Sequence, residues 1–133
     1  MSELGTQRHH ARERALEIFY EATIKARDVT TVLNQLPLRP DPYTVVLLAS
    51  AEQHLERANA LISEFAIDWQ LDRIAIVDRL IMTLAIGELL MEDGPPMAVV
   101  LDEAVELAKV YSTDGSPAFV NGVLSACAEH LIG

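Results

Sequence analysis

Apolar residues recur at intervals of three and four positions along almost the whole chain of 133 residues, and this spacing constrains the fold more than any other feature. It is the period of an α-helix that buries one face. No run alternates between apolar and polar residues as a half-buried strand would. Asn121-Gly122 is usually a strong hairpin signal, but its apolar neighbours keep the helical spacing, so we expect this pair inside a helix. The sequence therefore predicts an all-α fold: a compact bundle of six to seven helices in one domain over residues 1–133.

Prolines, glycines and short polar turns separate the expected helices. An apolar stripe predicts a first helix over residues 11–26, and a short apolar stretch follows over residues 29–36. Asp41 and Pro42 look like a helix start, because aspartate accepts hydrogen bonds from free backbone N–H groups and proline suits the first helical position. The later helices are expected over residues 43–65, 69–91, 97–111 and 116–131. The segment 69–91 is the richest in apolar residues, so we expect it to be a central helix with contacts on several sides.

The charge of the chain is strongly negative and unevenly spread. Twenty acidic residues against ten basic ones give a formal net charge of −10, which is unusual for a nucleic-acid binder. Residues 1–27 carry five basic and four acidic residues, whereas residues 28–133 carry five basic and sixteen acidic ones. A mildly basic arm on an acidic body suits two different partners, or simply a solvated surface.

Several functional classes find no support in the sequence. There is no phosphate-binding glycine loop, no GxSxG elbow and no Cys-x-x-Cys pair, so we expect neither catalysis nor a cofactor. His9 and His10 would point about 100° apart on a helix, so we expect them to be solvated rather than to share a metal. No stretch has the length of a membrane span and no secretory signal pattern is present, so we expect a soluble, cytoplasmic protein without a membrane partner. Cys127 lies in an apolar pattern and is expected to be a buried thiol.

Three segments, in the right order and spacing, resemble the NusB family. Residues 77–89 are similar to its V-D/E-R/K-x-I-L-R-L-A-x-Y-E-L segment, and residues 99–109 to its V-A-I-N-E-A-V-E-L-A-K segment. Residues 119–124 match its F-V-N-G-V-L outright, and residues 8–20 resemble its arginine-rich opening. The sequence differs from the family pattern at Gly87, where tyrosine is common, and at Asp102, where asparagine is usual.

The resemblance implies both a fold and a function. The family fold has two helical halves packed together, which here would be residues of about 1–67 and 68–133. The implied function is that of an RNA-binding transcription antitermination factor. It would pair with NusE, a ribosomal protein of the small subunit, bind the single-stranded boxA element of ribosomal RNA transcripts and keep RNA polymerase processive within the antitermination complex. The sequence leaves a homodimer open.

The candidate RNA-binding residues lie on the first helix and at the start of the last one: Arg8, His9, Arg12, Tyr20 and Phe119. Those on the first helix share one arc, which we expect to be exposed and to lie away from Glu13, Glu17 and Glu21. Guanidinium groups neutralise phosphates, and an aromatic ring gives an unpaired base a stacking surface. Phe119 could equally be a core residue, Tyr20 could equally border the core, and Arg14 could simply pair with Glu17 and Glu21.

Asp78 and Glu88 on the central helix are candidates for docking the basic partner NusE, with a solvated acidic face as the alternative.

Two rival functions stay open. His9 and His10 dilute the arginine cluster, since histidine is largely neutral at pH 7, so the chain could be a docking paralogue without RNA binding. The same helical module also resembles the N-terminal domain of ribosomal RNA cytosine methyltransferases, but those enzymes need an appended cofactor-binding domain with a catalytic cysteine, which this sequence lacks.

Overall fold

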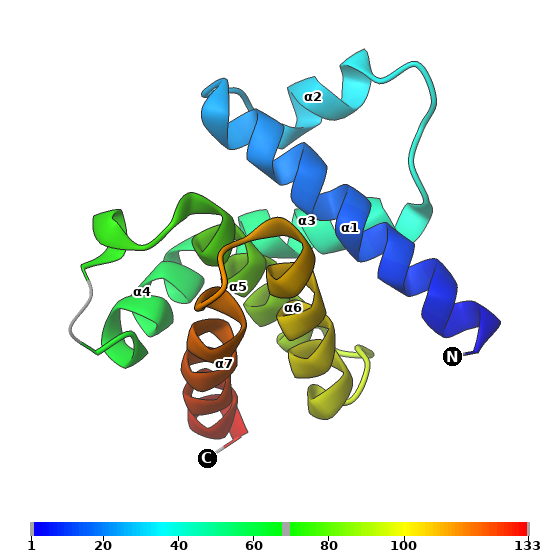
Figure 1. The fold of residues 1–133 in the computed structure, drawn as a ribbon. Coiled ribbons are helices and arrows are strands. Elements are labelled where there is room, and N and C mark those ends of the chain that lie inside the picture. The colour runs from blue at the N-terminus through cyan, green and yellow to red at the C-terminus, as the bar shows by residue number, and fades with distance from the viewer. Residues whose placement is uncertain (1, 68–69, 133) are drawn as a thin grey trace. The chain divides into compact units, whose positions relative to one another are not determined.

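The computed structural model describes residues 2–67 and 70–132, and these residues form helices without a single strand. The described residues contain seven α-helices, labelled in Figure 1, and one 3-10 helix, which confirms the predicted all-α class. In chain order they are α1 (Glu3–Ile24), α2 (Val29–Gln35), α3 (Pro42–Gln53), α4 (Leu55–Phe65), η1 (Leu71–Arg73), α5 (Ile76–Leu89), α6 (Met97–Tyr111) and α7 (Ser116–Ile132). Within the described ranges, no helix is long and apolar enough to cross a membrane.

The chain divides into two compact units, residues 1–49 and residues 50–133, so the boundary falls inside α3. We call them unit 1 and unit 2. The two helical halves expected from the sequence would instead meet at residues 67 and 68. Residue 68 lies outside the described residues, so that division stays a prediction.

In unit 1, α1 begins and ends with recognisable caps. The Ser2 hydroxyl accepts a hydrogen bond from the Gly5 backbone N–H at 2.9 Å, as an N-cap residue does. The helix ends at Ile24, two residues before the end of the predicted stripe. Ala26 is exposed and has a φ of 51°, and the next N–H, that of Arg27, donates to the Ala22 carbonyl at 2.9 Å. A left-handed residue after the last turn closes a helix in this way, so placing Ala26 in the buried stripe was wrong.

The predicted start of the next helix is confirmed, but its predicted length is wrong. The Asp41 carboxylate accepts a hydrogen bond from the Tyr43 N–H at 2.7 Å, and Pro42 is the first residue of α3. The single helix expected over residues 43–65 is two helices, because the backbone at His54 leaves helical geometry with φ −107° and ψ 18°. Apolar residues keep their spacing across this break, and no proline or glycine marks it in the sequence.

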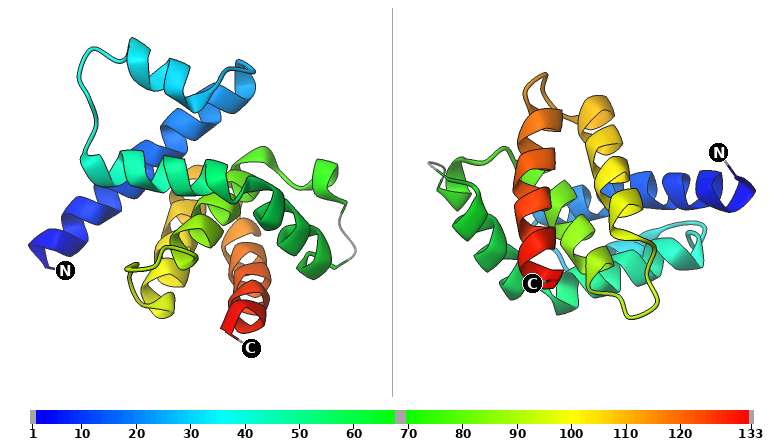
Figure 2. Two further views of the ribbon diagram at one scale, coloured as in Figure 1. Left: turned by 180° about the vertical axis from the view of Figure 1, so that it is seen from behind. Right: turned by 90° about the horizontal axis from the view of Figure 1, so that it is seen from below.

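Unit 2 is built around α5, and Figure 2 shows α4, α6 and α7 beside it. Every residue from Leu80 to Glu88 is buried, which confirms the central helix. This helix begins at Ile76, however, rather than near Trp69, which lies outside the described residues. Ile74 lies in the non-helical turn after η1, yet its side chain is buried. It therefore fits the apolar spacing of the sequence although it is not part of α5.

Gly87 lies at a close approach of two helices in unit 2. A Cβ atom at this position would lie 3.0 Å from the backbone nitrogen of Ala51 and 3.1 Å from its Cα. The Ser50 hydroxyl donates to the Gly87 carbonyl at 2.7 Å, which fixes the contact between the end of α3 and α5. The tyrosine that is common here in the NusB pattern would therefore require a different helix spacing.

The last helix, α7, confirms two further predictions. Asn121 and Gly122 lie inside it and are exposed. Cys127 is completely buried, and burial together with the nearby Glu64 carboxylate raises the pKa of its thiol to about 11.

Candidate nucleic-acid interface

In unit 1, one tyrosine ring orders two arginines of α1. The guanidinium carbon of Arg8 lies 4.5 Å from the centroid of the Tyr43 ring, and that of Arg12 lies 5.8 Å from it. Both distances are within the range of cation–π attraction. Tyr43 is the second residue of α3, and the Asp41 cap fixes its backbone. The arginines are thus held by a ring at the start of the helix that the sequence predicted from residue 43.

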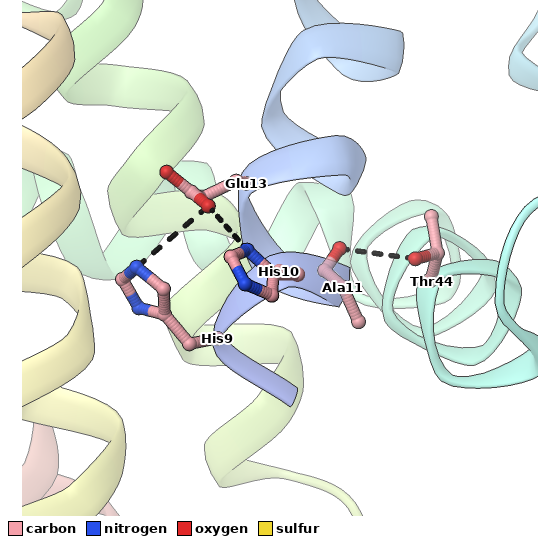
Figure 3. Close-up of polar contacts among 5 residues, drawn as sticks. All are labelled: His9, His10, Ala11, Glu13 and Thr44. Carbon is pink, nitrogen blue, oxygen red and sulfur yellow. Dashed lines mark hydrogen bonds and ion pairs between the residues drawn. The ribbon is translucent and has the colours of Figure 1, made fainter. Parts of the chain in front are cut away.

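The same corner of unit 1 is tied by hydrogen bonds between α1 and the start of α3. The Thr44 hydroxyl, fully buried, donates to the Ala11 carbonyl at 3.0 Å (Figure 3). The Gln7 amide donates to the Asp41 carboxylate at 2.7 Å. This bond, followed by the one from the Tyr43 N–H, holds the pKa of Asp41 below its usual value. The arginine-bearing turn of α1 is therefore fixed relative to Tyr43.

Arg12 is more buried than the sequence indicated. Its exposed fraction is only 5%, whereas Arg8 is half-buried. The expectation that the whole arc is exposed was therefore wrong for Arg12. The helical angles gave the direction of this side chain correctly relative to Arg8, but they could not show what covers it. An RNA-binding role for Arg12 stays a prediction.

Glu13 lies next to His9 rather than away from the basic arc. Figure 3 shows the Glu13 carboxylate between two imidazoles, with Oε1 3.7 Å from His9 Nε2 and 3.0 Å from His10 Nδ1. Positions 9 and 13 are one helical turn apart, so their side chains face the same way. The expected separation of acidic and basic residues was wrong here. Arg14 does pair with Glu17, at 3.2 Å, as the alternative interpretation held.

Tyr20 is 43% exposed on α1, so part of its side chain is accessible to a ligand. Stacking of an RNA base on this ring stays a prediction.

Unit 2 contains a cavity of about 380 Å³ next to the second aromatic candidate, Phe119. Two stretches of chain build it: the segment that leads from η1 into α5, and the turn between α6 and α7. The lining residues are Arg73, Ile74, Ala75, Asp78, Thr113, Gly115, Ser116 and Phe119. The fold thus places Asp78, a candidate for docking NusE, and Phe119, a candidate for binding RNA, at the same cavity.

Asp78 fixes one wall of this cavity. Its carboxylate is 5% exposed and accepts a hydrogen bond from the Ser112 hydroxyl at 2.5 Å and one from the Ser116 hydroxyl at 2.9 Å. The Ser116 hydroxyl also lies 2.8 Å from that of Thr113. A carboxylate on α5 therefore holds the turn that precedes Phe119.

Partner docking by Asp78 stays a prediction, and a charge reversal there cannot test docking separately from stability. Glu88 is only 3% exposed within the buried stretch of α5, and its docking role likewise stays a prediction. Among the described residues, no group of three or more histidine, cysteine, aspartate or glutamate side chains is placed to hold a metal ion.

Comparison with known proteins identifies the family. The model of the NusB family matches residues 9–129. The chain belongs to the NusB family. It is 45% identical over 131 residues to the transcription antitermination protein NusB of Streptomyces avermitilis, with 92% of this chain and 91% of the relative covered. The NusB of Streptomyces coelicolor is 44% identical over 131 residues, with 92% of both chains covered.

Solved NusB structures share the fold. The structure of T. maritima NusB superposes with a TM-score of 0.82 at 30% identity, covering 92% of this chain and 90% of that one. A chain from a crystal structure of the antitermination factors NusB and NusE in complex with dsRNA gives a TM-score of 0.79 at 24% identity, covering 94% of this chain and 98% of that one. The latter likeness establishes the common fold.

Proposed function

We propose that this NusB-family protein is a non-enzymatic, RNA-binding antitermination factor. It pairs with NusE, binds the single-stranded boxA element of ribosomal RNA transcripts and helps to keep RNA polymerase processive in the antitermination complex. The observation that carries the proposal is the arrangement on α1, where the Arg8 guanidinium is held over the Tyr43 ring and Tyr20 is exposed on the same helix. A cation and an aromatic ring are the two groups that single-stranded RNA needs, for its phosphates and its bases.

The distribution of charge supports the choice of unit 1 for the RNA. Unit 1 contains six basic and six acidic residues, so it is neutral overall. Unit 2 contains four basic and fourteen acidic residues and accounts for the whole net charge of −10. RNA phosphates are repelled less by unit 1, and the acidic unit 2 suits a basic protein such as a ribosomal one. A crystal structure of the antitermination factors NusB and NusE in complex with dsRNA contains a chain of the same fold.

A second candidate function is protein docking with little or no RNA binding. Two observations favour it: Arg12 is 5% exposed, and Glu13 lies 3.7 Å from His9. Both reduce the positive charge that α1 can offer to a phosphate. Under this alternative the chain would bind NusE but not discriminate boxA from other RNA.

The two functions are separated by fluorescence anisotropy with a labelled boxA-like RNA and a scrambled RNA of the same length and composition. Each RNA is titrated with this protein alone, with the NusE homologue alone and with both. We expect the mixture to bind boxA more tightly than either protein alone, and more tightly than it binds the scrambled RNA. Equal affinity of the mixture for both RNAs would favour the docking function. Sedimentation velocity of the protein alone tests for the homodimer.

A further inference from the structure

A second cavity lies within unit 1, between α1 and the loop of residues 36–41 that leads from α2 into α3. Its volume is about 380 Å³, and we call it the loop pocket. The residues that line it are Gln7, His10, Ala11, Arg14, Leu38, Arg39, Pro40, Asp41 and Thr44. Two of them are buried and bonded to each other, because the Thr44 hydroxyl donates to the Ala11 carbonyl at 3.0 Å (Figure 3). The base of the loop pocket is therefore fixed.

The loop presents an apolar and a cationic side chain next to each other. Leu38 is 83% exposed, more than any other large hydrophobic side chain in the described part of the chain, and Arg39 is exposed as well. Pro37 and Pro40 flank this pair. Proline fixes its own φ and restricts the residue before it to extended backbone, so this loop has few conformations to lose on binding. Leu38 and Arg39 are therefore offered to a partner at a low entropic cost.

The charge of Arg39 is available to that partner. No carboxylate among residues 2–67 and 70–132 pairs with Arg39. The carboxylate in the same lining, Asp41, instead accepts hydrogen bonds from the Gln7 amide and the Tyr43 N–H, each at 2.7 Å. Arg39 therefore gives the loop pocket a positive charge that no side chain of the described residues compensates.

Two further basic side chains line the loop pocket, but both have acidic neighbours. His10 Nδ1 lies 3.0 Å from Glu13 Oε1, and Arg14 Nη1 lies 3.2 Å from Glu17 Oε1. Together with Asp41, these acids would repel the successive phosphates of a nucleic-acid strand laid along the pocket. A single carboxylate placed at Arg39 would avoid most of this repulsion.

The apolar part of the lining narrows the choice of ligand further. Ala11, Leu38 and Pro40 are aliphatic, and the lining within the described residues has no phenylalanine, tyrosine or tryptophan on which a base could stack. An inorganic anion would use the guanidinium but leave the aliphatic surface uncovered. A purely apolar segment would bury the guanidinium without a partner. A protein segment with an aliphatic side chain next to a carboxylate satisfies both parts of the site.

We propose that the loop pocket is a docking site for an acidic segment of a partner protein, whose carboxylate pairs with Arg39 while the adjacent aliphatic side chain packs on Leu38. A guanidinium and a carboxylate can form two parallel hydrogen bonds, so Arg39→Lys should retain only part of the affinity. This contact is additional to those with RNA and NusE in the proposed function, and it depends on neither.

The test selects short random peptides displayed on phage against the whole chain and, in parallel, against Arg39→Gln. We expect peptides that carry an acidic residue beside leucine, isoleucine, valine or methionine to be enriched on the wild type alone. The enriched peptides are synthesised with a fluorescent label and titrated by anisotropy. Arg39→Gln should weaken their binding about tenfold or more, as for the loss of a charged hydrogen bond. Leu38→Ala should weaken it at least about fourfold, the effect of one buried methylene group.

Arg57→Gln is the matched control for the lost charge. Arg57 is exposed on α4, and within the described residues it likewise pairs with no carboxylate. Its replacement should change peptide affinity by less than about twofold. If Arg39 holds the peptide carboxylate, the effects of Arg39→Gln and of replacing the acidic residue of the peptide by its amide will be less than additive. Failure to enrich such peptides, or equal binding of the enriched peptides to the wild type and Arg39→Gln, would overturn the proposal.

Binding of boxA-like RNA to the complex with the NusE homologue separates a peptide site from a nucleic-acid site. We expect Arg39→Gln to change RNA affinity no more than Arg57→Gln does. A loss of RNA affinity in Arg39→Gln without a loss of peptide affinity would assign the loop pocket to RNA and overturn the peptide site. Absence of RNA binding by the wild-type complex would overturn the proposed function, whereas the selected peptides would still have to depend on Arg39.

Discussion

Replacement of Asp78 by alanine should destabilise the protein strongly. The carboxylate is 5% exposed and accepts hydrogen bonds from the Ser112 and Ser116 hydroxyls. A hydrogen bond to a charged group contributes about 1.5–3 kcal/mol. Because the two hydroxyls lie 2.9 Å apart and can still bond each other, we take the lower end for each bond and expect a loss of about 3 kcal/mol. Asp78→Asn keeps one acceptor oxygen and the shape of the side chain, so about half of that loss is expected.

The free energy of unfolding is measured by circular dichroism in urea, with Asp93→Ala as the control. Asp93 is an exposed acid in the same unit, and its replacement should change stability by about 0.5 kcal/mol or less. A loss in Asp78→Ala no larger than in Asp93→Ala would refute the reasoning, because the carboxylate would then not hold the α6–α7 turn.

Three further predictions concern the helices of unit 2. Gly122→Ala should raise the free energy of unfolding by about 0.5–1 kcal/mol, because the added Cβ meets nothing within 4 Å and alanine favours the helix; a decrease would contradict the exposed helical position. Gly87→Ala should lower it by about 1–3 kcal/mol in the same urea assay, because its Cβ would lie 3.0 Å from the Ala51 nitrogen; an unchanged value would mean that the helices separate freely. The pKa of the Cys127 thiol is raised from 9.0 to about 11 in the folded protein, so the thiol ionises first in the unfolded protein. The free energy of unfolding should therefore fall as pH rises from about 9 to about 11, and Cys127→Ala should lack this part of the decline. Identical dependence of stability on pH in both proteins would contradict this prediction.

The sequence was sufficient for most of the helices because their signals are local. The Asp41-Pro42 start and the position of Asn121-Gly122 inside α7 depend on neighbouring residues and on one period. The break at His54 was missed because the apolar spacing continues through it. The start of α5 was misplaced because a buried residue, Ile74, continues the pattern from a turn.

The candidate sites depended more on contacts between distant segments, and these were harder to foresee. Tyr43 meets Arg8 only because the start of α3 lies beside α1, and no spacing in the sequence relates the two residues. Arg73 and Phe119 line the same cavity, although they lie far apart in the chain. The burial of Arg12 likewise follows from tertiary packing, which helical angles do not contain.

Binding of RNA phosphate by Arg8 on α1 is central to the proposed function, and the salt dependence of RNA binding in Arg8→Ala tests it most directly. The control is Arg27→Ala, which removes an exposed arginine of the same unit whose guanidinium bonds the Gln35 side chain. With the NusE homologue present, Arg8→Ala should reduce the slope of log affinity against log salt by about 0.7. It should cost about 0.5–1 kcal/mol of stability through loss of the contact with Tyr43, and Arg27→Ala should leave the slope as in the wild type. Identical slopes for the wild type and Arg8→Ala would contradict a phosphate contact at α1.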